Sequence, residues 1–385
     1  MQWNYAQAPR LVAWEVTRAC DLACQHCRAV AQPGADPRQL STAEGFRLID
    51  EIAAFGQPII LILTGGDPLK RPDVFALAER ATQAGLRVVM SPSGTHITPA
   101  IVAELKRVGV QRISISVDGS TADLHDRFRC VPGAFAEATA SLAYAREGGL
   151  PFQINTTVTR HNQHDLTAML RLAVDLGAAT WDVFMLVPTG RGTVQMEITP
   201  AEYEAALHFI RDTSGWSSIP VKMTCAPHYK RIQAQERRRQ PAGQRGGGHP
   251  HGFSRGCMAG FGFCFVSHIG EVGGCGYLPL LAGNVRQAPL TAIYRDAPLF
   301  QSLRDPNLLQ GRCGVCEYRM LCGGCRARAL GASGNYLGEE PFCTYTPTAQ
   351  RPRALVNVET LVAHAVPHEE RAAGLVHRDR VPPVS

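Results

Sequence analysis

Short runs of apolar, often β-branched residues alternate with longer stretches in which apolar residues recur every three or four positions. The short runs predict buried strands, and the longer stretches predict amphipathic helices. The predicted strands cover residues 11–16, 58–64, 87–91, 112–117, 152–158 and 181–187. The predicted helices cover residues 42–55 (with Ser41 or Thr42 as N-cap), 73–84, 99–108, 135–147 and 166–176.

Six successive strand–helix units predict an α/β fold, a partial (β/α)6 barrel of the TIM type with a parallel sheet inside a layer of helices. Eight units close such a barrel, whereas six leave it open on one side, where a large substrate can enter. Because the chemistry of barrels lies at the carboxyl ends of their strands, the residues directly after each strand are the first candidates for a site.

Three cysteines follow the first predicted strand in a C-x3-C-x2-C spacing, Cys20, Cys24 and Cys27. Thiolates are soft ligands that select zinc, Cu(I) or iron–sulfur clusters. A structural zinc site needs a fourth ligand, either His26, the only local candidate, or a distant residue. A four-iron cluster held by three cysteines leaves one iron open to a small molecule. The loop alone leaves both alternatives open.

The next strands also end in chemically suggestive segments. Gly65, Gly66 and Asp67 follow the second predicted strand, Ser93 follows the third, and Asp118 ends the fourth. Paired glycines let the backbone approach a ligand closely, and the carboxylate offers an acceptor for an amine. An ordinary strand-to-helix turn explains the glycines equally well in isolation.

Composition places the chain among ordinary globular proteins longer than one average domain, at 385 residues. No apolar run approaches the roughly 20 residues of a membrane span, and the first ten residues lack the apolar core of a secretory signal. Thirteen cysteines in such a chain indicate metal sites in a reducing compartment rather than disulfides. We therefore expect a cytoplasmic protein.

The net charge of +6 is concentrated in residues 237–239 and in the tail after Arg351. Both segments are rich in Pro, Gly, His or Arg, which is typical of solvated loops. Neither interleaves aromatic with basic residues as a nucleic-acid groove does. Nucleic acid is therefore not an expected partner.

A second cysteine array occupies the last third of the chain. Its members are Cys257, Cys264, Cys275, Cys313, Cys316, Cys322, Cys325 and Cys343. In isolation this array fits two zinc sites. The two remaining cysteines, Cys130 and Cys225, are predicted to be buried thiols.

The cysteine triad, the Gly-Gly-acid-Pro turn and the six strand–helix units together resemble the radical S-adenosylmethionine (radical SAM) enzymes. The resemblance implies a [4Fe–4S] cluster on Cys20, Cys24 and Cys27, whose open iron is chelated by the methionine amine and carboxylate. One-electron reduction then yields a 5′-deoxyadenosyl radical.

Further roles follow from position in the resemblance. His26 is expected against the adenine, and Gly65, Gly66 and Asp67 are expected to receive the methionyl amine. The expected contacts to the ribose and carboxylate are Ser93, Ser116, Asp118 and Asn155. The family usually has Glu where this chain has Asp67, which keeps the acceptor but shortens its reach by one methylene.

The second array resembles a SPASM extension, which binds auxiliary iron–sulfur clusters. The resemblance assigns one cluster to Cys257, Cys264, Cys275 and Cys325, and another to Cys313, Cys316, Cys322 and Cys343. Alternatively Cys264 is not a ligand and an iron stays open to substrate. The implied domains are a barrel at 1–195, a linking helix with a Gly/Arg-rich loop at 196–255, the SPASM-type unit at 256–346 and a disordered tail at 347–385.

Longer stretches, among them QRISISVDG, PFQINTTVTRHN and TCAPHY, resemble the heme-forming branch of the radical SAM family. That resemblance implies oxidative decarboxylation of two propionates of iron-coproporphyrin III to vinyl groups, with a flavodoxin or ferredoxin as reductant. The arginines near the expected barrel mouth that can clamp carboxylates are Arg18, Arg28, Arg127, Arg129, Arg191 and Arg255. Each alone also fits an ion pair. His228 either ligates the substrate iron or closes a hydrogen bond in the core.

Two other classes stay open. One is a radical SAM enzyme that acts on another tetrapyrrole or crosslinks a peptide. The other is a non-enzyme, either a ferredoxin-like electron carrier or a zinc-bound interaction module, although neither needs an open-iron triad on a barrel.

Overall fold

One sheet runs through the computed structural model, which describes residues 3–239 and 255–347. Within these ranges its strand order is β10-β9-β8-β1-β2-β3-β4-β5-β6-β7. The first seven strands are β1 (Leu11–Thr17), β2 (Ile60–Gly65), β3 (Arg87–Met90), β4 (Arg112–Ser116), β5 (Phe152–Val158), β6 (Thr180–Met185) and β7 (Val221–Thr224). They lie in chain order and pair in parallel. The α/β fold predicted from the sequence is thereby confirmed.

The sheet extends beyond the six predicted strands at both ends. β7 follows β6, and β8 (Phe263–Val266) pairs in parallel with β1 on the side away from β2. Two short antiparallel strands, β9 (Glu271–Gly273) and β10 (Gly283–Asn284), complete this edge. Only two of the four residues of β7 are apolar, and β8 lies inside the second cysteine array, so neither has the sequence pattern of the six predicted strands. The described sheet ends at β7 and β10, so the barrel is open.

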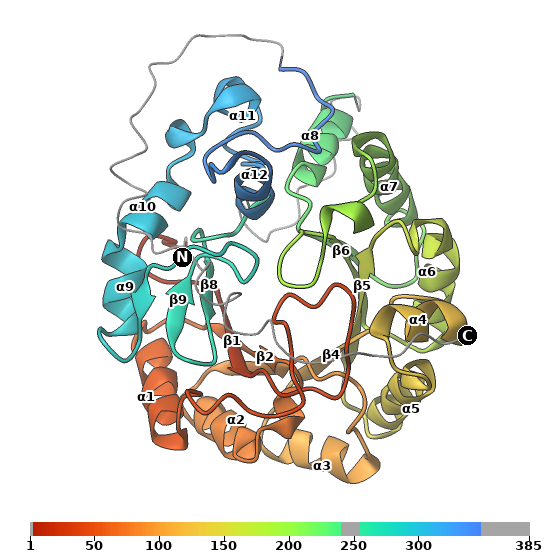
Figure 1. Cartoon of the computed structure of the whole chain (residues 1–385), viewed down its shortest axis with the longest axis vertical. Coiled ribbons are helices and arrows are strands. Elements are labelled where there is room, and N and C mark those ends of the chain that lie inside the picture. Colours follow the sequence, from red (N-terminus) through yellow and green to blue (C-terminus); the bar gives the residue numbers. More distant parts are fainter. Residues whose placement is uncertain (1–2, 240–254, 348–385) are drawn as a thin grey trace, which may run out of the picture.

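A layer of helices covers the outer face of the sheet (Figure 1). These helices are α1 (Thr42–Ala53), α2 (Val74–Gln83), α3 (Pro99–Arg107), α4 (Ala122–Arg129), α5 (Ala134–Glu147), α6 (Leu166–Asp175) and α7 (Pro200–Thr213). Side-chain caps define where several of them start: Ser41 and Glu44 form a capping box at α1, and Thr199 and Glu202 form another at α7. The helix α4 was absent from the predicted set.

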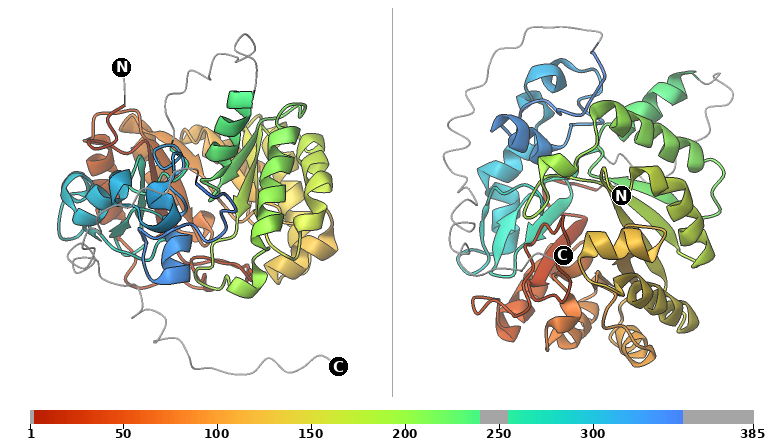
Figure 2. Two further views of the ribbon diagram at one scale, coloured as in Figure 1. Left: turned by 90° about the horizontal axis from the view of Figure 1, so that it is seen from above. Right: turned by 45° about the vertical axis from the view of Figure 1, so that its right-hand side comes forward.

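The remaining helices belong to the later part of the chain: α8 (Tyr229–Arg239), α9 (Leu290–Asp296), α10 (Pro298–Arg304), α11 (Gly311–Val315) and α12 (Arg326–Ser333). Figures 1 and 2 show α11 and α12 between α10 and α8, on the open side of the sheet. The buried Arg328 of α12 donates to the carbonyls of Leu186 (3.1 Å) and Cys225 (3.0 Å), which follow β6 and β7. It also pairs with the buried Glu340 at 3.1 Å. These contacts fasten the cysteine-rich part of the chain to the barrel.

Side chains of β1 divide between the two faces of the sheet. Trp14 is fully buried on the helix side, where a β-carbon on Gly45 of α1 would lie 2.8 Å from it and 2.7 Å from Leu77 of α2. Glu15, the next residue, must therefore face the barrel interior, because successive side chains of a strand alternate. The same interior face continues across the sheet through Ser116, whose register partner Asn155 is in turn aligned with Asp182. The interior is consequently polar along β4, β5 and β6.

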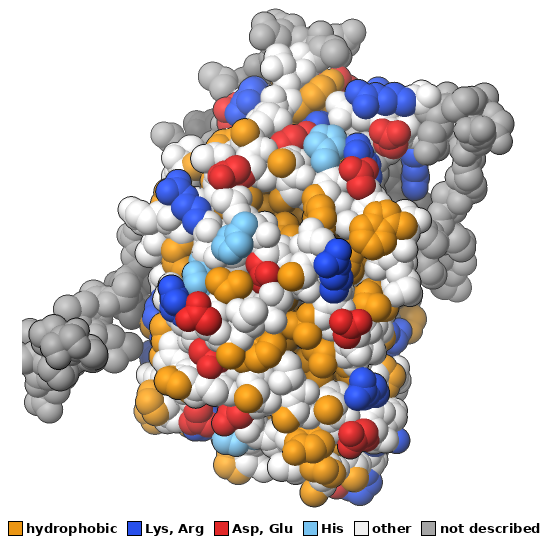
Figure 3. Space-filling model, turned by 90° about the vertical axis from the view of Figure 1, so that its right-hand side faces the viewer, with side chains coloured by type: hydrophobic (Ala, Val, Ile, Leu, Met, Phe, Trp, Pro, Cys, Tyr) orange, Lys and Arg blue, Asp and Glu red, His pale blue; other side chains and the backbone are white. Residues whose placement is uncertain are grey.

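The outer surface mixes charges of both signs. On the face drawn in Figure 3, positive and negative side chains are interspersed. Within the described ranges no helix is both long and apolar enough to cross a lipid bilayer. The domain boundaries expected from the sequence stay predictions, and the Gly/Arg-rich segment 240–254 and the expected disordered tail from residue 348 lie outside the described residues.

Replacement of Trp14 by alanine should lower the free energy of unfolding by about 3–5 kcal/mol, because it leaves a large cavity between β1, α1 and α2. Trp216, 68% exposed, supplies the matched control: Trp216→Ala should change it by no more than about 0.5 kcal/mol. Urea unfolding followed by circular dichroism measures both. Equal shifts for the two variants would contradict this packing.

Candidate functional site

The loop after β1 gathers Cys20, Cys24 and Cys27. Cys20 and Cys24 are buried and Cys27 is half-buried, and all three share a small apolar cluster with Leu22 and Ala134. The loop is held by backbone hydrogen bonds from Cys20 N to Gln32 O (2.8 Å) and from Cys27 N to Cys24 O (3.2 Å). The sequence spacing therefore becomes a compact three-thiol site at the carboxyl end of a barrel strand.

Each of the three sulfurs has its own N–H donor. The backbone N–H of Leu22 donates to Cys20 Sγ, and that of Ala31 donates to Cys27 Sγ, both at 3.4 Å. Arg129 Nη1 donates to Cys24 Sγ, also at 3.4 Å. Hydrogen bonds to cysteine sulfurs stabilise their anionic form and tune the potential of an iron–sulfur cluster. The donor set therefore fits a cluster held by three thiolates.

Arg129 also forms a buried ion pair with Asp118. The other oxygen of this carboxylate, Oδ1, accepts from Thr157 N at 2.7 Å. Burial opposes ionisation of Asp118, but Arg129 and nearby His26 and His125 hold its pKa below the usual range. Arg129 thus links Asp118, which follows β4, to the cysteine loop, and its predicted contact to a substrate stays a prediction.

The Gly65–Asp67 turn is fastened beside the cysteine loop. Gly66 N donates to Thr17 O (2.8 Å) and Asp67 N to Ala19 O (2.7 Å). A β-carbon on Gly66 would lie 2.4 Å from Ala19 O, so the glycine is required by the approach to the chain's own backbone. The Asp67 carboxylate is fully buried and accepts from Leu69 N (2.9 Å) and from the hydroxyl of Ser93. The predicted contact of this turn to a methionyl amine stays a prediction.

The imidazole of His26 stacks on Phe128, with ring centroids 4.3 Å apart and planes 1° from parallel. Phe128 in turn stacks on His161 at 5.4 Å. Burial lowers the pKa of His26 to about 4, so the ring is neutral at pH 7. Its buried Nδ1 has no hydrogen-bond partner among the described residues. A neutral, planar surface beside the cysteine loop suits contact with another ring system.

Glu15 forms a buried charged network that the sequence analysis missed. Its carboxylate meets Arg18 Nε (3.2 Å), Arg28 Nη2 (2.9 Å) and His268 Nδ1 (2.9 Å). His268 Nε2 continues to Asp36 at 3.1 Å. Burial opposes ionisation, but Arg28, His268 and Arg18 hold the pKa of Glu15 well below its usual range. The sequence signal that could have indicated this network is Glu15 itself, a single acidic residue inside the otherwise apolar residues 11–16 of strand β1.

The other predicted carboxylate clamps lie in three different places. Arg191 donates to the carbonyls of Cys24 (2.9 Å) and Ala31 (3.0 Å), and so braces the cysteine loop. Arg127 is exposed on α4 and pairs with Asp123. Arg255 is buried in the later part of the chain and donates to Leu303 O at 3.2 Å. The six arginines therefore do not form one cluster, and their contact to a substrate stays a prediction.

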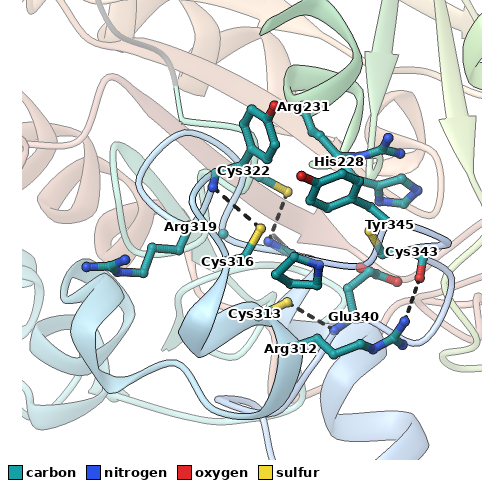
Figure 4. A pocket seen from close by; sticks show the side chains of 14 residues that line it. His228, Arg231, Arg312, Cys313, Cys316, Arg319, Cys322, Glu340, Cys343 and Tyr345 are labelled. Atoms are coloured by element: carbon teal, nitrogen blue, oxygen red, sulfur yellow. Dashed lines mark hydrogen bonds between the residues drawn. The ribbon is translucent and has the colours of Figure 1, made fainter. Parts of the chain in front are cut away.

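A pocket in the cysteine-rich part brings together four thiols of the second array (Figure 4). They are Cys313, Cys316, Cys322 and Cys343. Three of the sulfurs accept from backbone N–H groups at 3.3–3.5 Å, the donors being Glu340, Tyr318 and Gly324. The pocket encloses about 450 Å³ including its open side. The structure thus brings together the same four cysteines that the SPASM resemblance groups.

His228 lies on the wall of this four-cysteine pocket. Its ring is fully buried and stacks on Tyr203 with centroids 4.6 Å apart. Neither ring nitrogen has a hydrogen-bond partner among the described residues, and burial lowers the pKa of the ring to about 4. His228 therefore does not close a core hydrogen bond there, and it faces the cysteine pocket.

The other cysteines separate into distinct environments. Cys275 and Cys325 share an apolar cluster, and Cys257 N donates to Cys322 O at 3.0 Å. Cys264 lies in β8, fully buried in the main core. Cys130 is exposed at the end of α4, so the prediction that it is buried was wrong, because the helix ends in a left-handed turn at the surface.

In the part of the chain that the structure describes, no group of three His, Cys, Asp or Glu side chains is close enough to hold a single metal ion. A tetrahedral zinc site needs such convergence, since Zn–S bonds are about 2.3 Å long.

Comparisons with known proteins agree with this geometry. A family model described as the radical SAM superfamily matches residues 14–173, which run from β1 to α6. The chain belongs to the radical SAM superfamily. The family implies a [4Fe–4S] cluster used with S-adenosylmethionine.

Within this superfamily, the chain is similar to proteins named AdoMet-dependent heme synthase. The AdoMet-dependent heme synthase of Methanosarcina barkeri is 49% identical over 343 residues, covering 88% of this chain and 97% of that protein. The protein of the same name from Nitratidesulfovibrio vulgaris is 47% identical over 350 residues, covering 89% and 94%. The crystal structure of Streptococcus suis SuiB bound to S-adenosylmethionine superimposes with a TM-score of 0.69 at 14% identity, covering 88% of this chain and 78% of SuiB. The last comparison shows a shared fold.

The Cys24→Ala variant should bind about four fewer iron atoms per chain and should lose cleavage of S-adenosylmethionine, because two thiolates cannot hold the cluster of the loop. Iron and sulfide analysis after anaerobic reconstitution, with chromatography of 5′-deoxyadenosine, measures both effects. Cys130→Ala, at an exposed thiol, is the matched control and should behave as the parent protein. Retained cleavage in Cys24→Ala would exclude the loop as the cluster site.

Proposed function

We propose that this chain oxidatively decarboxylates two propionates of iron-coproporphyrin III to vinyl groups, which yields heme b. The observation that carries the proposal is the similarity, over 88–89% of this chain, to proteins named AdoMet-dependent heme synthase, at 47–49% identity. The three-thiol loop, with one N–H donor on each sulfur, supports the same chemistry.

The bound cluster and S-adenosylmethionine supply a carbon radical that removes one hydrogen atom. For each propionate, loss of a hydrogen atom from the β-carbon, of one electron and of CO2 leaves a vinyl group. The protein must therefore hold the carboxylates in place, keep water away and accept an electron. A flavodoxin or ferredoxin of a reducing cytoplasm would supply the electron that starts each cycle.

Arg18 and Arg28 are the candidates that this proposal uses for the carboxylates. Arg18 contacts Glu15 through Nε, and its side chain is 16% exposed. Its two terminal nitrogens would therefore bind a propionate. Arg28, 19% exposed, is fixed by Glu15 and lies 4.7 Å over the ring of Phe265. Planar guanidinium groups clamp carboxylates with two hydrogen bonds. Glu15 would then position both cations at the mouth of the barrel.

The later cysteines would accept the electron that the substrate gives up. We assign an auxiliary iron–sulfur cluster to the four-cysteine pocket of Cys313, Cys316, Cys322 and Cys343, where backbone N–H groups already point at three sulfurs. A further cluster is assigned to Cys275 and Cys325, which share an apolar cluster, together with Cys257, which the SPASM resemblance groups with them. Such acceptors are needed by an oxidative reaction and not by a redox-neutral rearrangement.

Anaerobic incubation of the reconstituted protein with S-adenosylmethionine, a reductant and iron-coproporphyrin III tests the proposal by mass analysis of the porphyrin. Loss of two carboxyl groups as CO2 is the expected result, with about two equivalents of 5′-deoxyadenosine formed. Unchanged porphyrin alongside 5′-deoxyadenosine would reject it and favour another tetrapyrrole or a peptide.

Cys316→Ala should separate the two halves of the reaction. The variant keeps the loop after β1 intact, so it should cleave S-adenosylmethionine as the parent does, but it should form no vinyl product because the electron acceptor is damaged. Product mass and 5′-deoxyadenosine are measured in the same assay, with Cys24→Ala as the variant that loses both. Vinyl formation by Cys316→Ala at the parent rate would exclude this pocket from the reaction.

A further inference from the structure

Besides Cys264, three thiols of the second array do not line the four-cysteine pocket, namely Cys257, Cys275 and Cys325. We call them the first auxiliary set. A four-iron cluster with all irons held by the protein needs a fourth thiolate. The SPASM resemblance makes Cys264 the candidate, and the structure offers another, Cys225.

Cys264 faces away from this set. It belongs to β8, where its register partner is Val12 of β1, and both side chains are fully buried in the main core. The next residue, Phe265, faces the opposite side of the strand, where a β-carbon on Gly276 would lie 3.1 Å from its ring. Since Gly276 directly follows Cys275, the first auxiliary set is on the Phe265 side of β8. The alternation of strand side chains thus separates Cys264 from it.

Cys225 lies among the members of the set. A β-carbon on Gly256, the residue before Cys257, would lie 2.4 Å from the carbonyl oxygen of Pro227, so the segment 225–227 packs against the start of that cysteine's loop. The carbonyl of Cys225 accepts from Arg328 Nη2 at 3.0 Å. Arg328 is in the first turn of α12, the helix that begins directly after Cys325. Cys225 also packs on the same apolar cluster as Cys275 and Cys325.

The backbone of Cys225 is itself unusual. Its φ of 58° is in the left-handed region, which glycine adopts freely and other residues adopt at a cost of roughly 1 kcal/mol or more. Its carbonyl is held by two donors, the hydroxyl of Tyr203 (2.9 Å) and Arg328. These two hydrogen bonds hold the backbone of Cys225 in this conformation.

We propose that Cys225, rather than Cys264, is the fourth thiolate of the first auxiliary set. The inference rests on the proposal that this set holds an iron–sulfur cluster. Because Cys225 directly follows β7, the cluster would be held jointly by the mouth of the barrel and by the cysteine-rich part of the chain. Arg28, the residue after Cys27 of the radical loop, donates to the carbonyl of Gly276, the residue after Cys275, at 3.5 Å, so this set would be the one beside the site where the reaction starts.

The test uses full-length protein in which Cys20, Cys24 and Cys27 are all alanine, so that only auxiliary iron remains. After anaerobic reconstitution this parent should hold about eight iron atoms per chain, the content of two cubanes. Cys225→Gly and Cys264→Ala are then compared by iron and sulfide analysis and by electron paramagnetic resonance of the reduced protein. Cys225→Gly should lose about four iron atoms or change the g values of one cluster, whereas Cys264→Ala should change neither.

Glycine is chosen because it removes the thiol and relieves the left-handed backbone, so the thermal midpoint of the apoprotein should stay equal or rise. A purely structural role for Cys225 would leave iron content and spectrum unchanged in Cys225→Gly, which overturns the assignment. A spectral change in Cys264→Ala as large as in Cys225→Gly overturns it as well. A parent that binds no auxiliary iron would overturn the auxiliary-cluster proposal itself, and the ligand assignment with it.

Discussion

The parallel pairing of β8 with β1 is the constraint on which the arrangement of this protein depends. It attaches a strand from the cysteine-rich part of the chain to the first strand of the barrel, whose carboxyl end carries the cysteine loop. Glu15 and His268, 253 residues apart in the sequence, meet at this junction at 2.9 Å. Arg28 adds to it, since it reaches from the loop to Glu15 and to the ring of Phe265 on β8. Both cysteine arrays are thereby held at the same end of the sheet.

Buried negative charge is the second organising feature. Thiolates and carboxylates removed from water require cationic or N–H partners, since an unpaired buried charge costs several kcal/mol. Arg129 joins Asp118 to Cys24 at the radical loop. In the later part of the chain, Arg328 forms an ion pair with the buried Glu340 and donates hydrogen bonds to the backbone carbonyls that follow β6 and β7. Arginines that look like substrate clamps in the sequence thus partly serve to brace the cysteine loops.

Much of the barrel was predictable, because its first six strands are apolar runs between helices with clear periodicity and caps. The strands β7 and β8 were not, since only two of the four residues of β7 are apolar and β8 lies inside the second cysteine array, away from the strand–helix units. The same limit affected the site. The triad, and the grouping of Cys313, Cys316, Cys322 and Cys343, follow from local spacing and resemblance and are gathered in the structure. The placement of Cys264 depends on which face of the short strand β8 it occupies. The placement of Cys225 depends on where the strand β7 ends.

The sequence by itself, through its resemblance to the radical SAM enzymes, determined the class of chemistry. A C-x3-C-x2-C loop after the first of several parallel strands is a local pattern, and local spacing is enough to place three thiols in one loop. Only the tertiary structure decided which distant groups meet these thiols: Arg129 at Cys24, the Glu15–His268 junction, and the surroundings of Cys225 and His228. Such contacts depend on strand register, side-chain alternation and the path of the chain across the open side of the barrel, which residue spacing does not encode.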